Sequence, residues 1–226
     1  MDLAEILDKA TEDMTPEEIA FLPDYHKAVR GLIYDPSIYD ANWFQHQDWQ
    51  HPWIERLMGW WVGQYGRPAS SLDLGAGDGH YSQVLGEMGA DPAVAVEVSP
   101  DAMPVMEDKV QGIVHDLRRP LDLGRGFELV LCLEVAEHLP LSAADTLCDT
   151  ISLHCQRYLL FTAAGPGQGG HGHCNLQPYR FWQDRLAARG LMFLPRETVH
   201  IKVSWERILG KELPWLPRNI GFFQRH

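Results

Sequence analysis

The feature that most constrains the fold is a glycine-rich turn placed directly after a short apolar segment. Residues 70–74 are typical of a buried strand, and Gly75, Gly77 and Gly79 follow at once. Beyond the turn, apolar residues recur at helical spacing over 81–88. A strand, a glycine turn and a helix form the first unit of a doubly wound α/β sheet, in which ligands bind beyond the carboxyl ends of the strands. The turn is therefore the first candidate ligand site.

The chain beyond this unit alternates predicted strands with predicted helices. Strands are expected at 93–98, 113–114, 127–133 and 157–162, with two more beyond Gly190, the last near 221–224; helices are expected at 141–154 and 178–189. Such alternation predicts a mostly parallel, seven-stranded sheet with helices on both faces.

The first part of the chain has a different character, because it is helical in pattern and rich in aromatic residues. Thr15 and the following proline are typical of a helix start, and residues 51–65 carry tryptophans near the helical period. We predict a helical extension or lid over 1–66 and a ligand-binding domain over 67–226. Aromatic and histidine residues of the lid that could cover an acceptor pocket, or only pack within the lid, are Tyr39, Trp43, Phe44, His46 and Trp49.

The charge of Asp73 indicates which ligand the glycine turn accepts. Its carboxylate stands two residues before Gly75 and would repel a pyrophosphate lying on the turn. It would favour a cationic ligand, such as one that carries an ammonium and a sulfonium. The glycines are also spaced GxGxG, whereas dinucleotide-binding folds use GxGxxG.

The sequence LDLGAGDG at 72–79 resembles the first motif of the class I S-adenosylmethionine (SAM)-dependent methyltransferases, whose fold is Rossmann-like. The resemblance covers about residues 69–189. It implies that SAM is the cofactor and S-adenosylhomocysteine (SAH) its product. It further implies that Glu97 takes the ribose hydroxyls, since a carboxylate accepts from two donors, and that Asp116 bonds the adenine amino group. The cofactor-binding residues expected in this way are Asp73, Leu74, Gly75, Ala76, Gly77, Gly79, Glu97, Val98, Asp116, Leu117 and Leu133.

A second group of candidate residues follows the predicted strands at 127–133 and 157–162. The sequence EVAEH at 134–138 looks like an element of many small-molecule methyltransferases, and a glycine-rich loop at 165–175 carries two histidines. Neighbouring parallel strands end at the same edge of a sheet, so these side chains can converge. Methyl transfer needs orientation and a proton acceptor, and histidine suits that role because its pKa lies near neutrality. The candidate catalytic residues are His173, His138, Glu134, Glu137 and His171, with His173 or His138 as the base.

Two alternatives stay open for this group. Its carboxylates and imidazoles could bind a divalent metal that orients a diol, as the matching residues do in enzymes that methylate the terminal ribose of small RNAs. We do not expect a metal here. The acids could also serve only to begin a helix and to pack against the cofactor.

Charge and composition limit the partners. The net charge of −12 argues against a nucleic-acid partner, although local basic groups exist at Arg118 and Arg119 and at Arg185 and Arg189. No stretch approaches the roughly 18 continuous apolar residues of a membrane span. The start of the chain lacks the basic region of a secretory signal, and the cysteines at 132, 148, 155 and 174 form no CxxC pair, so we expect a cytoplasmic protein with free thiols.

The sequence therefore predicts a SAM-dependent methyltransferase that acts on an oxygen or nitrogen of a small-molecule acceptor. The alternatives are a methyltransferase of RNA or another macromolecule, and a non-catalytic SAM-fold binding protein. A dinucleotide oxidoreductase is disfavoured by Asp73 and by the glycine spacing.

Overall fold

The computed structural model describes residues 15, 39–44, 46–106, 109–170 and 172–226. The helices expected before Tyr39 and the candidate catalytic residue His171 lie outside the described residues. The division of the chain at residue 66 accordingly stays a prediction.

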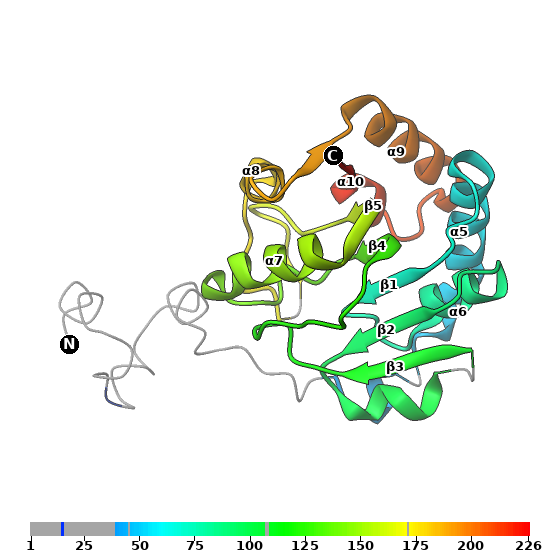
Figure 1. The fold of residues 1–226 in the computed structure, drawn as a ribbon, viewed down its shortest axis with the longest axis horizontal. Helices are drawn as coiled ribbons and strands as arrows, with labels where there is room; N and C mark the ends of the chain where they lie inside the picture. The colour runs from blue at the N-terminus through cyan, green and yellow to red at the C-terminus, as the bar shows by residue number, and fades with distance from the viewer. Residues whose placement is uncertain (1–14, 16–38, 45, 107–108, 171) are drawn as a thin grey trace.

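The centre of the described structure is one seven-stranded sheet with the order β3-β2-β1-β4-β5-β7-β6 (Figure 1). Its strands are β1 (Ser71–Leu74), β2 (Ala93–Glu97), β3 (Val110–Val114), β4 (Phe127–Cys132), β5 (Cys155–Phe161), β6 (Leu191–Phe193) and β7 (Gly221–Arg225). Neighbours from β3 to β5 pair in parallel, whereas β7 is antiparallel to both β5 and β6. The predicted mostly parallel sheet is confirmed. The chain reverses its direction of winding between β1 and β4, which creates a crevice at their carboxyl ends.

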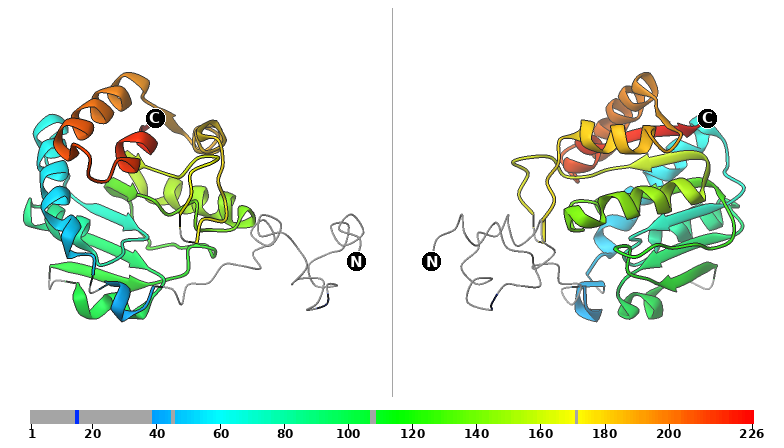
Figure 2. Two further views of the ribbon diagram at one scale, coloured as in Figure 1. Left: turned by 180° about the vertical axis from the view of Figure 1, so that it is seen from behind. Right: turned by 60° about the vertical axis from the view of Figure 1, so that its left-hand side comes forward.

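Alternate residues of the central strands supply two separate cores, because successive side chains of a strand point to opposite faces. In β4, Val130 belongs to the core on one face of the sheet, and Leu129 and Leu131 belong to the core on the other. The first core is closed by α7 (Ala144–His154) and α8 (Tyr179–Ala187). The second is closed by α5 (His51–Tyr65), α6 (His80–Glu87) and α9 (Pro195–Leu209). Figure 2 shows these two groups of helices on opposite faces.

The structure contains elements that were not among those expected from the sequence. Between β6 and β7, where we predicted only two strands beyond Gly190, lie α9 and the short helix α10 (Trp215–Asn219). Strand β3 is also longer than the predicted pair at 113–114. Further short helices are α4 (Ala41–Phe44), η3 (Asp48–Gln50), η4 (Pro100–Val105) and η5 (Leu141–Ala143).

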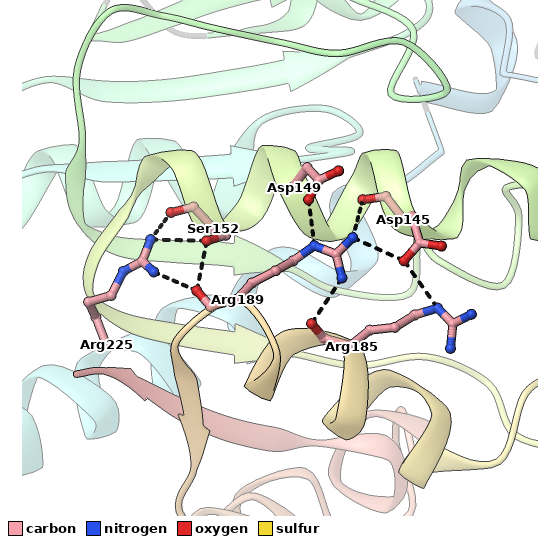
Figure 3. Close-up of polar contacts among 6 residues, drawn as sticks. All are labelled: Asp145, Asp149, Ser152, Arg185, Arg189 and Arg225. Carbon is pink, nitrogen blue, oxygen red and sulfur yellow. Dashed lines mark hydrogen bonds and ion pairs between the residues drawn. The ribbon is translucent and has the colours of Figure 1, made fainter.

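An arginine network joins the helices of the first core to the last strand (Figure 3). Arg189 Nε donates to Asp149 at 2.5 Å and its Nη2 donates to Asp145 at 3.0 Å, which ties the end of α8 to α7. Arg225 of β7 donates to the Ser152 backbone and to the carbonyl of Arg189. These contacts hold the C-terminal strand in place, and β7 in turn positions the α10 segment that precedes it.

Two further sequence expectations concern membrane-spanning helices and the state of the cysteines. None of the helices in the described part of the chain is long and apolar enough to cross a membrane. All of Cys132, Cys148, Cys155 and Cys174 are buried free thiols, as expected.

Candidate active site

A cavity of about 400 Å³ lies at the carboxyl ends of the central strands. Residues at or after the ends of β1, β2, β3 and β4 form one part of its wall. The rest comes from the segment 39–54, from Tyr81 of α6, from His173 after β5 and from the segment before β7. The predicted cofactor residues that line it are Asp73, Gly75, Ala76, Gly77, Glu97, Val98, Leu117 and Leu133. Of the remaining predictions, Leu74 is buried within β1 and Gly79 caps the start of α6, and neither lines the cavity.

The glycine turn is shaped by backbone conformations that side chains disfavour. Gly75, Gly77 and Gly79 all have positive φ, at 77°, 59° and 79°. The backbone N–H groups of Gly75 and Ala76 donate to the carbonyl of Val96, which fastens the turn to β2. A Cβ at Gly75 would come within 2.5 Å of Cγ2 of Val135. Only glycine at position 75 lets the turn lie against the segment after β4.

The carboxyl group of Asp73 is buried and incompletely satisfied. The residue is 3% exposed, and its Oδ2 atom has no hydrogen-bond partner among the described residues. Burial, reinforced by the nearby negative charges of Glu97 and Asp78, raises the pKa of Asp73 to about 8. A cation placed beside Oδ2 would stabilise the ionised form, so the residue fits a ligand ammonium.

Glu97 lies opposite the turn and is held by backbone groups. Its Oε2 accepts from the N–H of Gly77 at 3.0 Å, and its Oε1 accepts from the N–H groups of Val98 and Ser99. Burial raises the pKa of Glu97, and these hydrogen bonds oppose that effect. Because a carboxylate can accept about four hydrogen bonds, Glu97 keeps capacity for a ligand hydroxyl.

The structure does not bring Asp116 into the cavity wall. Its neighbours His115 and Leu117 line the cavity, whereas the Asp116 carboxylate receives Nε and Nη2 of Arg118, the latter at 2.7 Å. Burial acts to raise the pKa of Asp116, but hydrogen bonds and the charge of Arg118 outweigh it and lower the pKa below its ordinary value. For the predicted contact with adenine, the Asp116 carboxylate would have to leave Arg118 and turn toward the cavity. That contact stays a prediction.

Glu134 lines the cavity and has a strained backbone conformation. Its φ of 56° is unusual for a residue with a side chain. The Thr162 hydroxyl accepts its backbone N–H at 2.7 Å, and the Asn219 amide donates to its Oε1 at 3.2 Å. Strain of this kind costs about 1–3 kcal/mol and is typical of functional sites. Asn219 of α10 was not among the candidates drawn from the sequence.

The structure brings three predicted catalytic residues together. Ligand atoms of Glu137, His138 and His173 lie within 4.8 Å of one another, and the two imidazoles meet edge to face with centroids 4.8 Å apart. Glu137 is fully buried; its Oε1 accepts the N–H of Ala164, and its Oε2 has no hydrogen-bond partner among the described residues. Burial and the charge of Glu134 raise the pKa of Glu137. His138 and His173 both line the cavity, with this carboxyl group behind them.

Of the five residues predicted to belong to a lid, two line the cavity and three do not. Tyr39 and Trp43 line the cavity, and the hydroxyl of Tyr39 lies 3.1 Å from Nδ1 of His138. Phe44 is buried, and Trp49 is 48% exposed without lining the cavity. The imidazole of His46 contacts the carbonyl of Asn42, four positions earlier, and His46 does not line the cavity. Cavity residues that the sequence did not single out are Gln47, Gln50, Ile54, Asp78, Tyr81, His115, Leu139, Leu213, Trp215 and Leu216.

Comparison with known proteins finds matches to the fold but not to the sequence. No protein-family model matches the chain, and no curated protein matches it in sequence. Solved structures do match its fold. A TehB-like SAM-dependent methyltransferase from Corynebacterium glutamicum is 16% identical with a TM-score of 0.59, over 85% of this chain and 100% of that one.

Two further matches carry bound ligands in their crystals. The magnesium protoporphyrin IX methyltransferase from Synechocystis, with bound SAH, is 13% identical with a TM-score of 0.56, over 99% of this chain and 92% of that one. The 1,6-didemethyltoxoflavin-N1-methyltransferase from Burkholderia thailandensis, with bound 1,6-didemethyltoxoflavin and SAH, is 17% identical with a TM-score of 0.52, over 80% of this chain and 82% of that one. At these identities the likeness establishes the class I methyltransferase fold.

Proposed function

We propose that this chain is a SAM-dependent methyltransferase that transfers a methyl group to an oxygen or nitrogen of a small-molecule acceptor. The observation that carries the proposal is the buried carboxyl group of Asp73, whose Oδ2 has no hydrogen-bond partner among the described residues and lies beside a glycine turn. A buried carboxylate is costly unless it is paired, so the site calls for a cationic ligand. The crystals of similar fold that contain SAH support the same cofactor here.

The cofactor would be held by the residues around the turn. Asp73 would face its ammonium, and Glu97 would face its ribose hydroxyls. Leu117 and Leu133 would contact the apolar face of the adenine. When bound, SAM supplies a methyl group on a positively charged sulfur atom, from which an incoming oxygen or nitrogen can displace it.

The acceptor must lose a proton as its oxygen or nitrogen is methylated. An imidazole nitrogen of His138 or His173 would take that proton, because both rings line the cavity. Glu137 behind them would stabilise the resulting imidazolium once its carboxyl group is ionised. Tyr39, in contact with Nδ1 of His138, would fix the orientation of that ring.

The size and charge of the cavity favour a small acceptor. The matched enzymes named for magnesium protoporphyrin IX and didemethyltoxoflavin act on small molecules. The net charge of −12 disfavours RNA, which is bound chiefly by lysine and arginine. The convergence of Glu137, His138 and His173 disfavours a non-catalytic binding protein. Buried free thiols support a reducing compartment such as the cytoplasm.

Ligand-induced thermal stabilisation tests the cofactor assignment. SAM or SAH should raise the melting temperature, whereas NAD should not. Asp73→Ala should abolish the shift with SAM. Stabilisation by NAD alone would contradict the assignment, and so would an unchanged SAM affinity in Asp73→Ala. A screen of acceptors with methyl-labelled SAM, repeated with His138→Ala and His173→Ala, then identifies the acceptor and the base.

A further inference from the structure

The ionisable side chains of the cavity wall are mainly acidic. Asp73, Asp78, Glu97 and Glu134 line it, and the described residues of its wall include neither lysine nor arginine. Histidines at 115, 138 and 173 are its other titratable groups apart from tyrosines. An anionic group on the acceptor would enter beside Glu134 and the buried Glu137 without a fixed positive partner. Unpaired buried charges of like sign are strongly unfavourable, so the wall selects against carboxylates and phosphates.

Part of the cavity wall is aromatic and apolar. Trp43, 36% exposed, comes from α4, and Trp215, 40% exposed, comes from α10. Leu213 and Leu216 flank Trp215, and Tyr39 flanks Trp43. In the right panel of Figure 2, the blue helix α4 and the red helix α10 lie along the same edge of the sheet. Two indole surfaces left open inside one cavity suit a flat ring that covers them.

The α10 segment is fixed where it meets the catalytic residues. Asn219 donates to Oε1 of Glu134, and Leu216 packs into the core that contains Leu131. Trp215 therefore stands on an anchored support next to the end of β4. A side chain held in this way can select a substrate by shape, because it loses little freedom when the substrate binds.

On the premise of the proposed function, we propose that the acceptor is a planar aromatic molecule without an anionic group and that Trp215, with Trp43, determines this specificity. Its hydroxyl or amino group points toward His138 and His173. Its ring covers the indole surfaces. A positively charged substituent is accepted, since both the acidic wall and the indole faces attract cations.

Three probes that share one catechol ring test the charge rule in the SAH-loaded protein. They are 4-methylcatechol, which is neutral, dopamine, which is cationic, and 3,4-dihydroxybenzoate, which is anionic. Isothermal titration calorimetry should show binding of the first two and at least about tenfold weaker binding of the benzoate. Equal or tighter binding of the benzoate would overturn the proposal, as would the failure of all three to bind protein that still binds SAH. Failure to bind SAH would instead overturn the proposed function.

Variants of Trp215 test the role of the ring. Trp215→Phe should retain affinity for the neutral probe within about threefold, whereas Trp215→Leu, which keeps an apolar side chain, should lose at least about tenfold. Trp49→Ala is the matched control, because Trp49 is exposed nearby and does not line the cavity. SAH affinity measured on each variant reports whether the fold is intact. Equal affinity of the Leu and Phe variants for the probe would refute recognition by a planar ring.

Discussion

The hydroxyl of Tyr39 lies 3.1 Å from Nδ1 of His138, and this contact joins the segment before α5 to the candidate base. The same imidazole meets His173 edge to face. The tautomer and orientation of His138 thus depend on a residue nearly a hundred positions earlier in the chain. A hydrogen bond of this kind contributes about 0.5–1.5 kcal/mol.

Tyr39→Phe should therefore release the His138 ring without disturbing the cofactor end of the cavity. We expect the imidazole nitrogen resonances of His138 to shift in two-dimensional NMR spectra of the SAH-loaded variant. With an identified acceptor, turnover should fall about threefold to tenfold, the range that such a hydrogen bond implies. Unchanged His138 resonances would show that the tyrosine does not orient the ring.

The raised pKa of Asp73 makes SAM binding a proton-linked reaction. With its pKa near 8, the free protein holds a proton on Asp73 at pH 7, and a ligand cation favours the ionised form. Binding at pH 7 should therefore release most of a proton, and the affinity for SAM should increase as the pH is raised from 6 towards 8. Calorimetry in buffers with different ionisation enthalpies measures this release. Asp73→Asn should bind more weakly and release no proton from this position; an equal release from that variant would remove Asp73 as the source.

Much of the fold could be predicted because its signals are local. β4 is almost continuously apolar, as a buried central strand should be, and Gly75 and Gly77 mark the turn after β1. The sequence of α9 also carries an amphipathic pattern, with Ile201 and Trp205 on its buried side. We nevertheless predicted only two strands in this part of the chain. Helix α10 contains Pro217 and has only five residues, so no periodic pattern could reveal it.

The site could be predicted only in part, because only some of its residues belong to local sequence patterns. Asp73 and Glu97 lie at fixed spacings from the glycine turn, and the structure places both in the cavity wall. Trp215 lines the cavity and Asn219 contacts Glu134 because the antiparallel strand β7 pairs with β5 and brings the preceding segment to the carboxyl ends of the central strands. No spacing rule in the sequence reports such a return of the chain. The pairing of Asp116 with Arg118 depends on the side-chain conformations of both residues, which motifs do not specify.

A stacked histidine pair at the start of α6 makes the stability of the protein sensitive to acid. His51 and His80 stack with centroids 3.6 Å apart; Asp78 accepts from His51 at 2.6 Å, and Glu55 and Gln83 face His80. Burial, and then the neighbouring His51, lowers the pKa of His80 below 6.5. The unfolded chain consequently binds more protons at this residue, so the free energy of unfolding should fall as the pH drops below about 6.5.

Urea unfolding at pH 5, 6, 7 and 8 measures this dependence. In His80→Gln the decrease between pH 7 and pH 5 should be smaller than in the wild type. His226→Gln, which changes an exposed histidine at the end of the chain, should leave the decrease unaltered. Identical profiles for the wild type and His80→Gln would refute the role of His80.

The cluster of Glu137, His138 and His173 should act without a metal. Its ligand atoms are up to 4.8 Å apart, whereas two ligands of a zinc ion at about 2.0–2.1 Å cannot be more than about 4 Å apart. Treatment with EDTA should therefore leave SAH binding and methyl transfer unchanged, and purified protein should contain no stoichiometric metal by elemental analysis. Loss of transfer after EDTA, restored by Mg²⁺ or Mn²⁺, would assign the cluster to a metal instead.

The contact between the glycine turn and the segment after β4 should be essential for cofactor binding. In Gly75→Ala the new Cβ would lie 2.5 Å from Cγ2 of Val135, in addition to the strain of a positive φ. Gly124→Ala is a matched control, because Gly124 has φ +64° but nothing within 4 Å of the added Cβ. Both variants should lose about 1–3 kcal/mol of stability through strain, and only Gly75→Ala should also lose SAH binding. Because removal of the Val135 methyl groups opens the required space, the double variant Gly75→Ala/Val135→Ala should regain part of that affinity. Calorimetry with SAH measures all three, and wild-type affinity in Gly75→Ala would show that the turn tolerates displacement from Val135.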